Sequence, residues 1–248
     1  MTGVGRREFL KIAGTAGLVA CAPVRLFANT AATQARRLAM VVDLRKCREK
    51  KDCTLCISAC HKTHNVPDFG NAKDEIKWIW KEPFENAFPD QDHDFQAGLL
   101  KNGPAVLLCN HCDAPPCVSV CPTQATWKRE TDGLVMMDYH RCIGCRYCMA
   151  ACPYGSRSFN WRDPRPFIKE ITDGFPTRTR GVVEKCNFCE ERLAQGQPPA
   201  CVKACPVNAM VFGDLRDPGS PARRLLESNF SIRRKPSLGT QPQVFYIV

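Results

Sequence analysis

The 248-residue sequence has no apolar stretch of about 20 residues, the length that a membrane-spanning helix needs. The run from Ile12 to Ala22 and the apolar C-terminus from Val244 to Val248 are both too short. The sequence also has no phosphate-cradling glycine motif, no nucleophile elbow and no other catalytic constellation. We therefore expect no substrate site in this chain, and we expect any membrane contact to come from a partner or from a lipid anchor.

What the sequence does have is cysteine, 17 residues in all. The clearest motif is C-x2-C-x2-C-x3-C-P, formed by Cys142, Cys145, Cys148, Cys152 and Pro153, and it is a pattern for ligating [4Fe–4S] clusters. Three thiolates on a tight loop can converge on three iron atoms, whereas the fourth cysteine ligates the other cluster of a pair. The proline suits the first turn of a helix, where its missing N–H would have no partner.

Counted along the chain, this motif is the third of four blocks. The other three blocks also hold four cysteines each: Cys47, Cys53, Cys56 and Cys60; Cys109, Cys112, Cys117 and Cys121; and Cys186, Cys189, Cys201 and Cys205. The first block departs from the pattern, because five residues separate its first pair and His61 stands where the others have proline. The four blocks account for 16 of the 17 cysteines, which indicates a framework of sites and leaves only Cys21 over.

The formal net charge of +10 could indicate nucleic acid or an acidic membrane as a partner. Four oxidised clusters with their thiolate ligands would contribute roughly −8, which brings the loaded protein near neutrality. We therefore interpret the basic excess as compensation for buried anionic clusters, and we predict no nucleic-acid partner.

The N-terminus carries Arg6 and Arg7, followed by Phe-Leu-Lys and a short apolar segment that contains Gly14 and Gly17. This order resembles a twin-arginine export signal, and the glycines argue against a stable amphipathic helix. Residues 1–32 are predicted to be that signal peptide, and the protein is predicted to be periplasmic. Export by this route suits proteins that take up cofactors before crossing the membrane, so the cysteines are not expected to form disulfides.

Cys21 follows Leu-Val-Ala, which resembles a lipobox, in which the cysteine becomes the lipidated first residue of the mature chain. The alternative is a signal-peptide cysteine that is removed by cleavage near Ala28 or Ala32. Both possibilities stay open.

Short apolar runs precede the cysteine blocks and are predicted to be strands: Leu38–Asp43, 106–108, 134–138 and 181–184. The order of block, strand and block over residues 105–155 is typical of a two-cluster ferredoxin module, so blocks two and three are predicted to pair. Blocks one and four then have only each other as partners.

The predicted fold is therefore α+β, with two ferredoxin-like [4Fe–4S] modules, one inserted in the other, and long loops. The first module comprises residues 37–75 and 178–215, and the inserted module comprises residues 100–165. Residues 76–99 form a connecting insertion, and residues 216–248 form a C-terminal extension.

Within the connecting insertion, Ile76, Trp78 and Trp80 alternate with other residues, which predicts a strand with one apolar face that covers a cluster. Farther along, the acidic patch of Asp90, Asp92, His93 and Asp94 could hold a cation, although a solvated loop is the simpler interpretation.

His61 and His64 follow the first block, but the spacing is not the C-x2-C-H of a haem attachment site. We interpret both histidines as packing or supporting residues and not as iron ligands.

With these blocks placed, roughly residues 38–248 resemble the four-cluster iron–sulfur subunits of membrane-associated respiratory complexes. That group includes the electron-transfer subunits of dimethyl-sulfoxide, polysulfide and tetrathionate reductases and of the formate-dependent nitrite reductase system (the NrfC type). The stretches Ala59–Pro67 and Leu238–Pro242 are most similar to the exported iron–sulfur subunits of Dsr complexes (the DsrO type) of sulfate reducers and sulfur oxidisers.

The resemblance implies four [4Fe–4S] clusters, each held by three cysteines of one block and the last cysteine of its partner block. In the first module the implied ligands are Cys47, Cys53, Cys56 and Cys205 for one cluster, and Cys186, Cys189, Cys201 and Cys60 for the other. In the inserted module they are Cys109, Cys112, Cys117 and Cys152, and then Cys142, Cys145, Cys148 and Cys121.

The function implied by this resemblance is electron transfer without bond chemistry, so the chain is not an enzyme by itself. Electrons would pass between a quinone-interacting integral-membrane subunit of the NrfD or DsrP type and a redox partner such as a multihaem cytochrome c, in dissimilatory sulfur metabolism. The alternative partner is the molybdopterin subunit of a tetrathionate, polysulfide or thiosulfate reductase.

Two further interpretations concern residues near the ligands. Lys46, Arg141, Arg146 and Lys185 lie beside cysteines and either raise cluster potentials or act only as surface charges. A structural zinc protein is the other reading of paired C-x2-C units, but zinc sites do not need the C-x2-C-x2-C-x3-C-P spacing.

Overall fold

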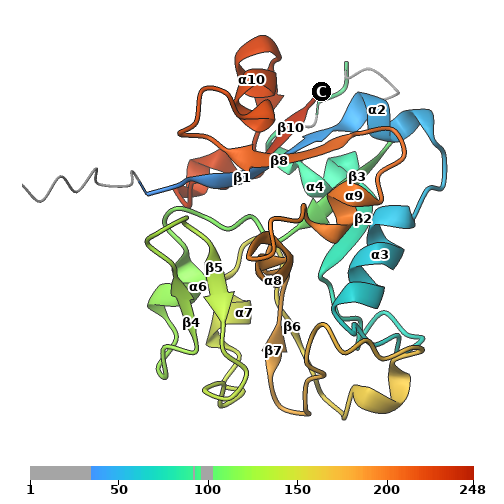
Figure 1. Ribbon diagram of the computed structural model, residues 1–248, viewed down its shortest axis with the longest axis vertical. Coiled ribbons are helices and arrows are strands. Elements are labelled where there is room, and N and C mark those ends of the chain that lie inside the picture. The colour runs from blue at the N-terminus through green and yellow to red at the C-terminus, as the bar shows by residue number, and fades with distance from the viewer. Residues whose placement is uncertain (1–34, 92, 96–102) are drawn as a thin grey trace, which may run out of the picture. The chain divides into compact units, whose positions relative to one another are not determined.

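The computed structural model describes residues 35–91, 93–95 and 103–248 (Figure 1). The predicted export signal over residues 1–32, together with Cys21, lies outside the described residues. The elements are short, and in chain order they are β1 (Leu38–Asp43), α2 (Leu44–Glu49), α3 (Leu55–Thr63), β2 (Ile79–Pro83), α4 (Phe84–Ala87), η1 (Pro89–Gln91), β3 (Pro104–Leu108), α6 (Pro116–Ser119), β4 (Thr126–Lys128), β5 (Val135–Met137), α7 (Tyr147–Ala151), β6 (Ser158–Phe159), η2 (Arg165–Phe167), β7 (Val183–Glu184), α8 (Glu190–Leu193), α9 (Ala200–Lys203), β8 (Met210–Asp214), α10 (Pro221–Ser228), β9 (Ser231–Ile232), η3 (Pro236–Leu238) and β10 (Val244–Ile247).

The main sheet has the strand order β8-β1-β10-β9. The predicted strand Leu38–Asp43 is confirmed as β1, and all six of its residues are buried, as its continuous apolar run requires. It pairs antiparallel with β8 and parallel with β10, so that Met40 is a register partner of both Phe212 and Val244. Residues 216–248, predicted as an extension, therefore supply two strands of this sheet.

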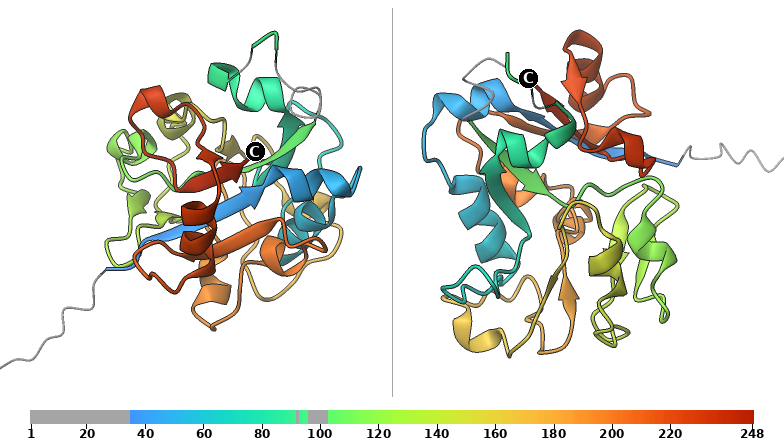
Figure 2. Two further views of the ribbon diagram at one scale, coloured as in Figure 1. Left: turned by 90° about the horizontal axis from the view of Figure 1, so that it is seen from above. Right: turned by 180° about the vertical axis from the view of Figure 1, so that it is seen from behind.

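The two faces of the sheet bury different groups. Met40 and Val42 belong to the main core, whereas Val41 packs with Ala222 of α10 and with Ile247. Successive residues of a strand point to opposite faces, so α10 covers one face and the main core covers the other. Figure 2 shows α10 on the side of the sheet away from the cysteine-bearing loops.

The remaining strands form two-stranded antiparallel ribbons, β2–β3, β4–β5 and β6–β7. The predicted strands over residues 106–108, 134–138 and 181–184 are confirmed as β3, β5 and β7, with slightly different ends. The strand predicted from Ile76 begins only at Ile79, and the single apolar face was wrong. Ile79 and Trp80 point to opposite faces and are both buried, because the ribbon is covered on both sides.

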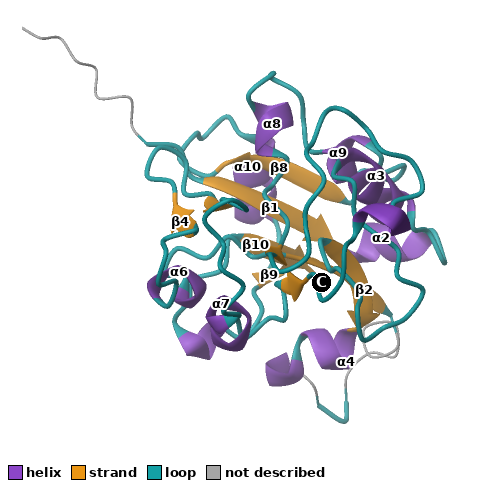
Figure 3. Cartoon of the chain, turned by 90° about the horizontal axis from the view of Figure 1, so that it is seen from below, coloured by secondary structure: helices purple, strands orange, loops and turns teal. Residues whose placement is uncertain are grey.

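Two pairs of short helices accompany the cysteine blocks. Helix α3 of the first block packs against α9 of the fourth, and α6 of the second block packs against α7 of the third. Figure 3 shows these pairs on different sides of the strands. The fold is thus α+β, as predicted, and no helix in the described part of the chain is long and apolar enough to cross a membrane.

A fully buried ion pair fixes the segment after α3 to β7. Arg178 and Glu184 approach to 2.6 Å, and both side chains have 0% exposure. The guanidinium also donates to the backbone carbonyl of Asn65, while the carboxylate accepts a hydrogen bond from the indole N–H of Trp78 at 2.9 Å. Because each charge has a partner and further hydrogen bonds, the pair is tolerated in the core.

Candidate metal centres

The structure gathers the 16 block cysteines into four sets, and all of them have free thiols. Between the second and third blocks, one cavity is lined by Cys109, Cys112, Cys117 and Cys152, which we call the Cys109 set. A second cavity is lined by Cys121, Cys142, Cys145 and Cys148, which we call the Cys142 set. Each cavity therefore takes three cysteines from one block and one from the other.

Blocks one and four exchange their last cysteines in the same way. Cys47, Cys53, Cys56 and Cys205 interact electrostatically with one another and form the Cys47 set. Cys60 interacts in turn with Cys186, Cys189 and Cys201, and these four form the Cys60 set. These four groupings are those implied by the family resemblance, and iron ligation by them stays a prediction.

Electrostatic interactions between cysteines of neighbouring sets indicate the order in which the sets follow one another. Cys56 and Cys60 interact along α3, Cys109 interacts with Cys186, and Cys117 interacts with Cys148. The order is therefore the Cys47 set, the Cys60 set, the Cys109 set and the Cys142 set. The Cys60 set is entirely buried, whereas three of the four cysteines in each end set are partly exposed.

The spacing of the sulfurs disfavours zinc. A tetrahedral zinc site with Zn–S bonds of about 2.3 Å holds its sulfurs about 3.8 Å apart. Among the described residues, no three cysteine sulfurs all lie within 4.8 Å of one another. A cubane cluster binds its four thiolates to four separate iron atoms and so spreads them farther apart, which fits the donor sets observed here.

Burial favours the protonated thiol at several of these cysteines. Burial and the neighbouring Cys47 raise the pKa of Cys56 to about 11, and burial and the neighbouring Cys109 raise the pKa of Cys112 to about 12. The thiolate is the form that binds metal, so loading these sites must release protons. Cluster assembly is therefore coupled to deprotonation of a buried thiol group.

Backbone N–H groups of the fourth block are directed at its sulfurs. Phe188 N–H donates to Cys186 Sγ at 3.4 Å, and Ala200 N–H donates to Cys189 Sγ at 3.3 Å. Hydrogen bonds to cluster sulfurs raise the reduction potential, because they stabilise the more negative reduced state. The loop geometry thus supplies part of the electrostatic environment of a cluster.

Of the four basic residues that lie beside ligands in the sequence, only one is buried. Lys46, Arg141 and Arg146 are exposed, and Arg146 stacks on the ring of Trp161 at 4.9 Å. Lys185 is 1% exposed, and its Nζ donates to the carbonyl of Cys186 at 2.8 Å and to that of Val135. Lys185 therefore lies between the fourth block and β5.

Sequence reasoning missed His111, a fully buried residue between two cysteines of the second block. Its Nδ1 accepts a hydrogen bond from Val135 N–H, so its Nε2 carries the proton and donates to the Cys186 carbonyl at 3.1 Å. Burial holds the pKa of His111 well below its usual value, which matches this neutral form. The ring also stacks on Phe188 at 3.8 Å. His111 thus bridges the second and fourth blocks, and only its position between ligands could have suggested it.

Arg157 was also missed. It follows Cys152 by five residues, and its guanidinium donates to Cys117 Sγ at 3.1 Å. Sequence reasoning considered only basic residues directly beside ligands, so no spacing rule indicated this one.

His64 supports the Cys60 set, as predicted for a packing residue. Its Nδ1–H donates to the Cys60 carbonyl at 3.0 Å, its Nε2 lies 2.9 Å from a carboxylate oxygen of Glu191, and its ring stacks on Trp78. Burial opposes its charge, but hydrogen bonds to Cys189 and Glu191 raise the pKa of His64 to about 9. Both ring nitrogens are therefore used in holding the first block against the fourth.

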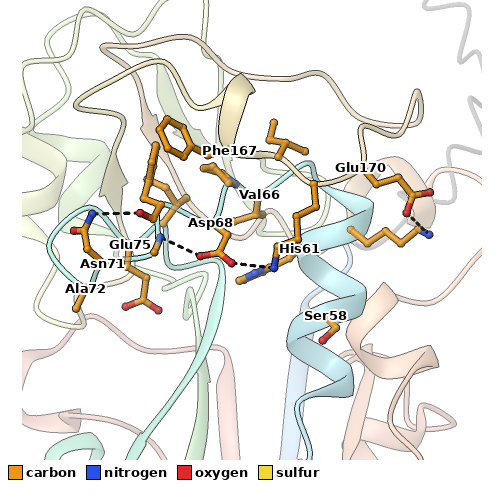
Figure 4. A pocket seen from close by; sticks show the side chains of 16 residues that line it. Ser58, His61, Val66, Asp68, Asn71, Ala72, Glu75, Phe167 and Glu170 are labelled. Carbon is orange, nitrogen blue, oxygen red and sulfur yellow. Dashed lines mark hydrogen bonds and ion pairs between the residues drawn. The ribbon is translucent and has the colours of Figure 1, made fainter.

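His61 faces a different environment. It lines a pocket of about 640 Å³ beside α3, where Asp68 is turned toward its imidazole (Figure 4). None of the described residues that line this pocket is a cysteine. In the acidic patch, Asp90, His93 and Asp94 are exposed and belong to no potential metal-binding group, and Asp92 lies outside the described residues.

Comparisons with known proteins agree with this chemistry. The model of the 4Fe–4S dicluster domain family matches residues 105–165 and 173–215. The chain is 39% identical to the Hdr-like menaquinol oxidoreductase iron–sulfur subunit 1 of Archaeoglobus fulgidus, over 98% of this chain and 97% of that protein. It is 39% identical to the menaquinone reductase iron–sulfur cluster-binding subunit of Nitratidesulfovibrio vulgaris, over 84% and 87% of the two chains. It is 38% identical to the arsenate respiratory reductase iron–sulfur subunit ArrB of Shewanella sp., over 85% and 96%.

The fold and its cysteine sets define an iron–sulfur electron-transfer protein that carries [4Fe–4S] clusters. The chain belongs to the family of iron–sulfur subunits of menaquinol oxidoreductases and respiratory reductases that contains these relatives.

Proposed function

We propose that the chain is an exported electron-transfer subunit that relays electrons through four [4Fe–4S] clusters. One end would exchange electrons with a quinone-interacting membrane subunit, and the other end with a redox partner such as a multihaem cytochrome c. The chain itself would catalyse no bond chemistry. The observation that carries the proposal is the grouping of 16 cysteines into four sets that follow one another in a line.

The solvent exposure of the four cysteine sets supports the proposed electron relay. The outer sets, named for Cys47 and Cys142, have partly exposed cysteines, while the sets between them are more deeply buried. Partly exposed sites at the two ends are suited to exchange with partners, and buried sites between them are suited to passing electrons onward without loss to solvent oxidants. Each cluster changes by one electron, so no proton or bond rearrangement is required.

We propose further that the Cys109 and Cys142 sets form one ferredoxin-like module inserted within another. The pairing of α3 with α9, of α6 with α7 and of β1 with β8 supports this arrangement. The segments that would form the outer module lie on either side of the inserted one in sequence.

The names of two relatives, a menaquinol oxidoreductase subunit and a menaquinone reductase subunit, support a quinone-interacting membrane partner. A role of the DsrO type in dissimilatory sulfur metabolism rests on the stretches Ala59–Pro67 and Leu238–Pro242. The first stretch contains Cys60, and Thr240 of the second forms a hydrogen bond with Cys112 and with Tyr154. The first stretch therefore contributes to the Cys60 set, and the second contacts the Cys109 set.

A second candidate is the electron-transfer subunit of a molybdopterin oxidoreductase. The arsenate respiratory reductase subunit among the relatives favours a terminal reductase as the partner. Purification of the native complex separates the two, because a triple-haem cytochrome would favour the Dsr type and a large molybdenum subunit would favour the alternative.

Export by the twin-arginine route to the periplasm is part of the proposal and rests on Arg6 and Arg7. Replacing both arginines by lysine should retain the precursor in the cytoplasm, as measured by fractionation. Periplasmic accumulation of that variant would contradict this route.

The central test is the iron, acid-labile sulfide and zinc content of anaerobically purified protein. About 16 iron and 16 sulfide per chain are expected for four cubane clusters. A value near 12 would mean that one set does not hold a [4Fe–4S] cluster, and the irregular Cys47 block would be examined first. Zinc without sulfide would refute the electron-transfer proposal.

A further inference from the structure

Arg157 connects two cysteine sets through one buried guanidinium. Its Nη2 donates to Cys117 Sγ of the Cys109 set at 3.1 Å and to the hydroxyl of Thr126 at 2.8 Å. It also forms a side-chain hydrogen bond with Cys148 of the Cys142 set, and the residue as a whole is only 4% exposed. The side chain therefore lies at the junction between the third and fourth sets of the line.

The fold gives this charge no carboxylate. Among the described residues, no aspartate or glutamate oxygen lies within 4.0 Å of the Arg157 guanidinium, whereas buried Arg178 is paired with Glu184 at 2.6 Å. An arginine stays protonated in proteins, and a buried cation without a counter-ion is strongly destabilising. The anions within its reach are the sulfurs of two cysteine sets, so the position is favourable when those sets carry the negative charge of clusters.

We infer that Arg157 is a positioning residue that raises the reduction potentials of the clusters held by the Cys109 and Cys142 sets. This inference rests on the proposed function, because it requires those sets to hold clusters. In the transfer step one electron leaves one cluster, which is oxidised, and arrives at the adjacent cluster, which is reduced. No bond forms or breaks, and the fixed positive charge stabilises whichever cluster carries the additional electron.

The guanidinium reaches a ligand of each set. It donates to Cys117 Sγ of the Cys109 set at 3.1 Å, and it also forms a side-chain hydrogen bond with Cys148 of the Cys142 set. Hydrogen bonding to sulfur and burial of a nearby charge are both established means of setting cluster potentials. The clusters of both sets should therefore depend on Arg157.

The test is a redox titration followed by electron paramagnetic resonance, on loaded, purified wild type and on Arg157→Met and Arg157→Lys. In Arg157→Met, the midpoint potentials of two clusters should shift to more negative values, while the other two stay unchanged. Arg157→Lys retains the charge, so its midpoint potentials should stay close to the wild-type values. Arg141→Met is the matched control, because Arg141 is also beside a cysteine but is exposed, and its removal should shift no potential comparably.

Unchanged potentials in Arg157→Met, with iron and sulfide at the wild-type level, would overturn the inference and leave the proposed function intact. If Arg157→Met does not retain its iron, Arg157→Gln decides, because it keeps an N–H donor and removes only the charge. A negative shift in that variant supports the role, and wild-type potentials overturn it. Absence of clusters from the wild type itself would instead refute the proposed function on which the inference depends.

Discussion

Replacing Glu184 with glutamine should destabilise the protein more than the change of one atom suggests. The substitution preserves shape but removes the negative charge that faces Arg178 at 2.6 Å, at a site with no solvent exposure. Breaking a buried ion pair by removing one partner costs about 3–5 kcal/mol, because the remaining charge is buried without compensation. The expected loss of stability is therefore about 3–5 kcal/mol.

The effect should be visible at the clusters. Arg178 donates to the Asn65 carbonyl just beyond α3, and Glu184 lies just before the fourth block, so the pair holds blocks one and four together. If about half of a 3 kcal/mol loss appears in the unfolding rate, iron is released about tenfold faster. The assay is the decay of cluster absorbance at a fixed guanidinium concentration in the presence of an iron chelator.

A double variant separates charge from packing. Arg178→Met with Glu184→Gln removes both charges, and replacement of a whole buried pair by uncharged groups is often neutral. The double variant should therefore release iron more slowly than Glu184→Gln alone. Glu227→Gln is the matched control, because it breaks an exposed pair with Arg223 on α10 that should contribute less than about 1 kcal/mol. Wild-type kinetics in Glu184→Gln, or a double variant as labile as the single one, would refute the reasoning.

Three further predictions concern the sites and their supporting turns. Cys152→Ser should lower the iron content by about four per chain and should abolish the same paramagnetic signal as Cys117→Ser, because both cysteines line one cavity; loss of different signals would contradict this grouping. Gly144→Ala should reduce iron incorporation, measured as iron per purified chain, because φ is +71° and a Cβ would overlap the carbonyl oxygen of Gly181, whereas Gly174→Ala meets no atom and should load normally. Asp43→Ala should cost about 1 kcal/mol in guanidinium unfolding, because the Asp43 side chain caps α2, and Asp43→Asn should restore most of it.

The sequence predicts the cysteine ligands of this protein better than it predicts the residues that surround those ligands. Cysteine spacing is set by the geometry of a cluster loop, so the four blocks and the strands that enter them could be read directly from the chain. The grouping of Cys60 with the fourth block was implied by the family resemblance, and the structure brings these residues together. The electrostatic environment could not be predicted in the same way. Of four basic residues beside ligands only Lys185 is buried, and burial depends on packing between segments far apart in sequence.

The same reason explains why His111 and Arg157 were missed. His111 accepts its hydrogen bond from Val135, and Arg157 reaches Cys117 from the far end of the next block. No spacing in the sequence predicts either contact, because each joins segments that meet only in the folded protein. The error at β2 has a related origin, since alternation in the sequence assumed one covered face where the fold covers both.

The parallel pairing of β1 with β10 has a consequence for biosynthesis. The first strand of the described chain cannot complete its hydrogen bonds until the last strand, Val244–Ile247, has left the ribosome. The Cys47 set likewise has to wait for Cys205. A nascent chain therefore presents an open β1 edge until Val244–Ile247 has been synthesised, and an incomplete Cys47 set until Cys205 has been synthesised. The main sheet and the Cys47 set are thus completed late, from segments that leave the ribosome far apart in time.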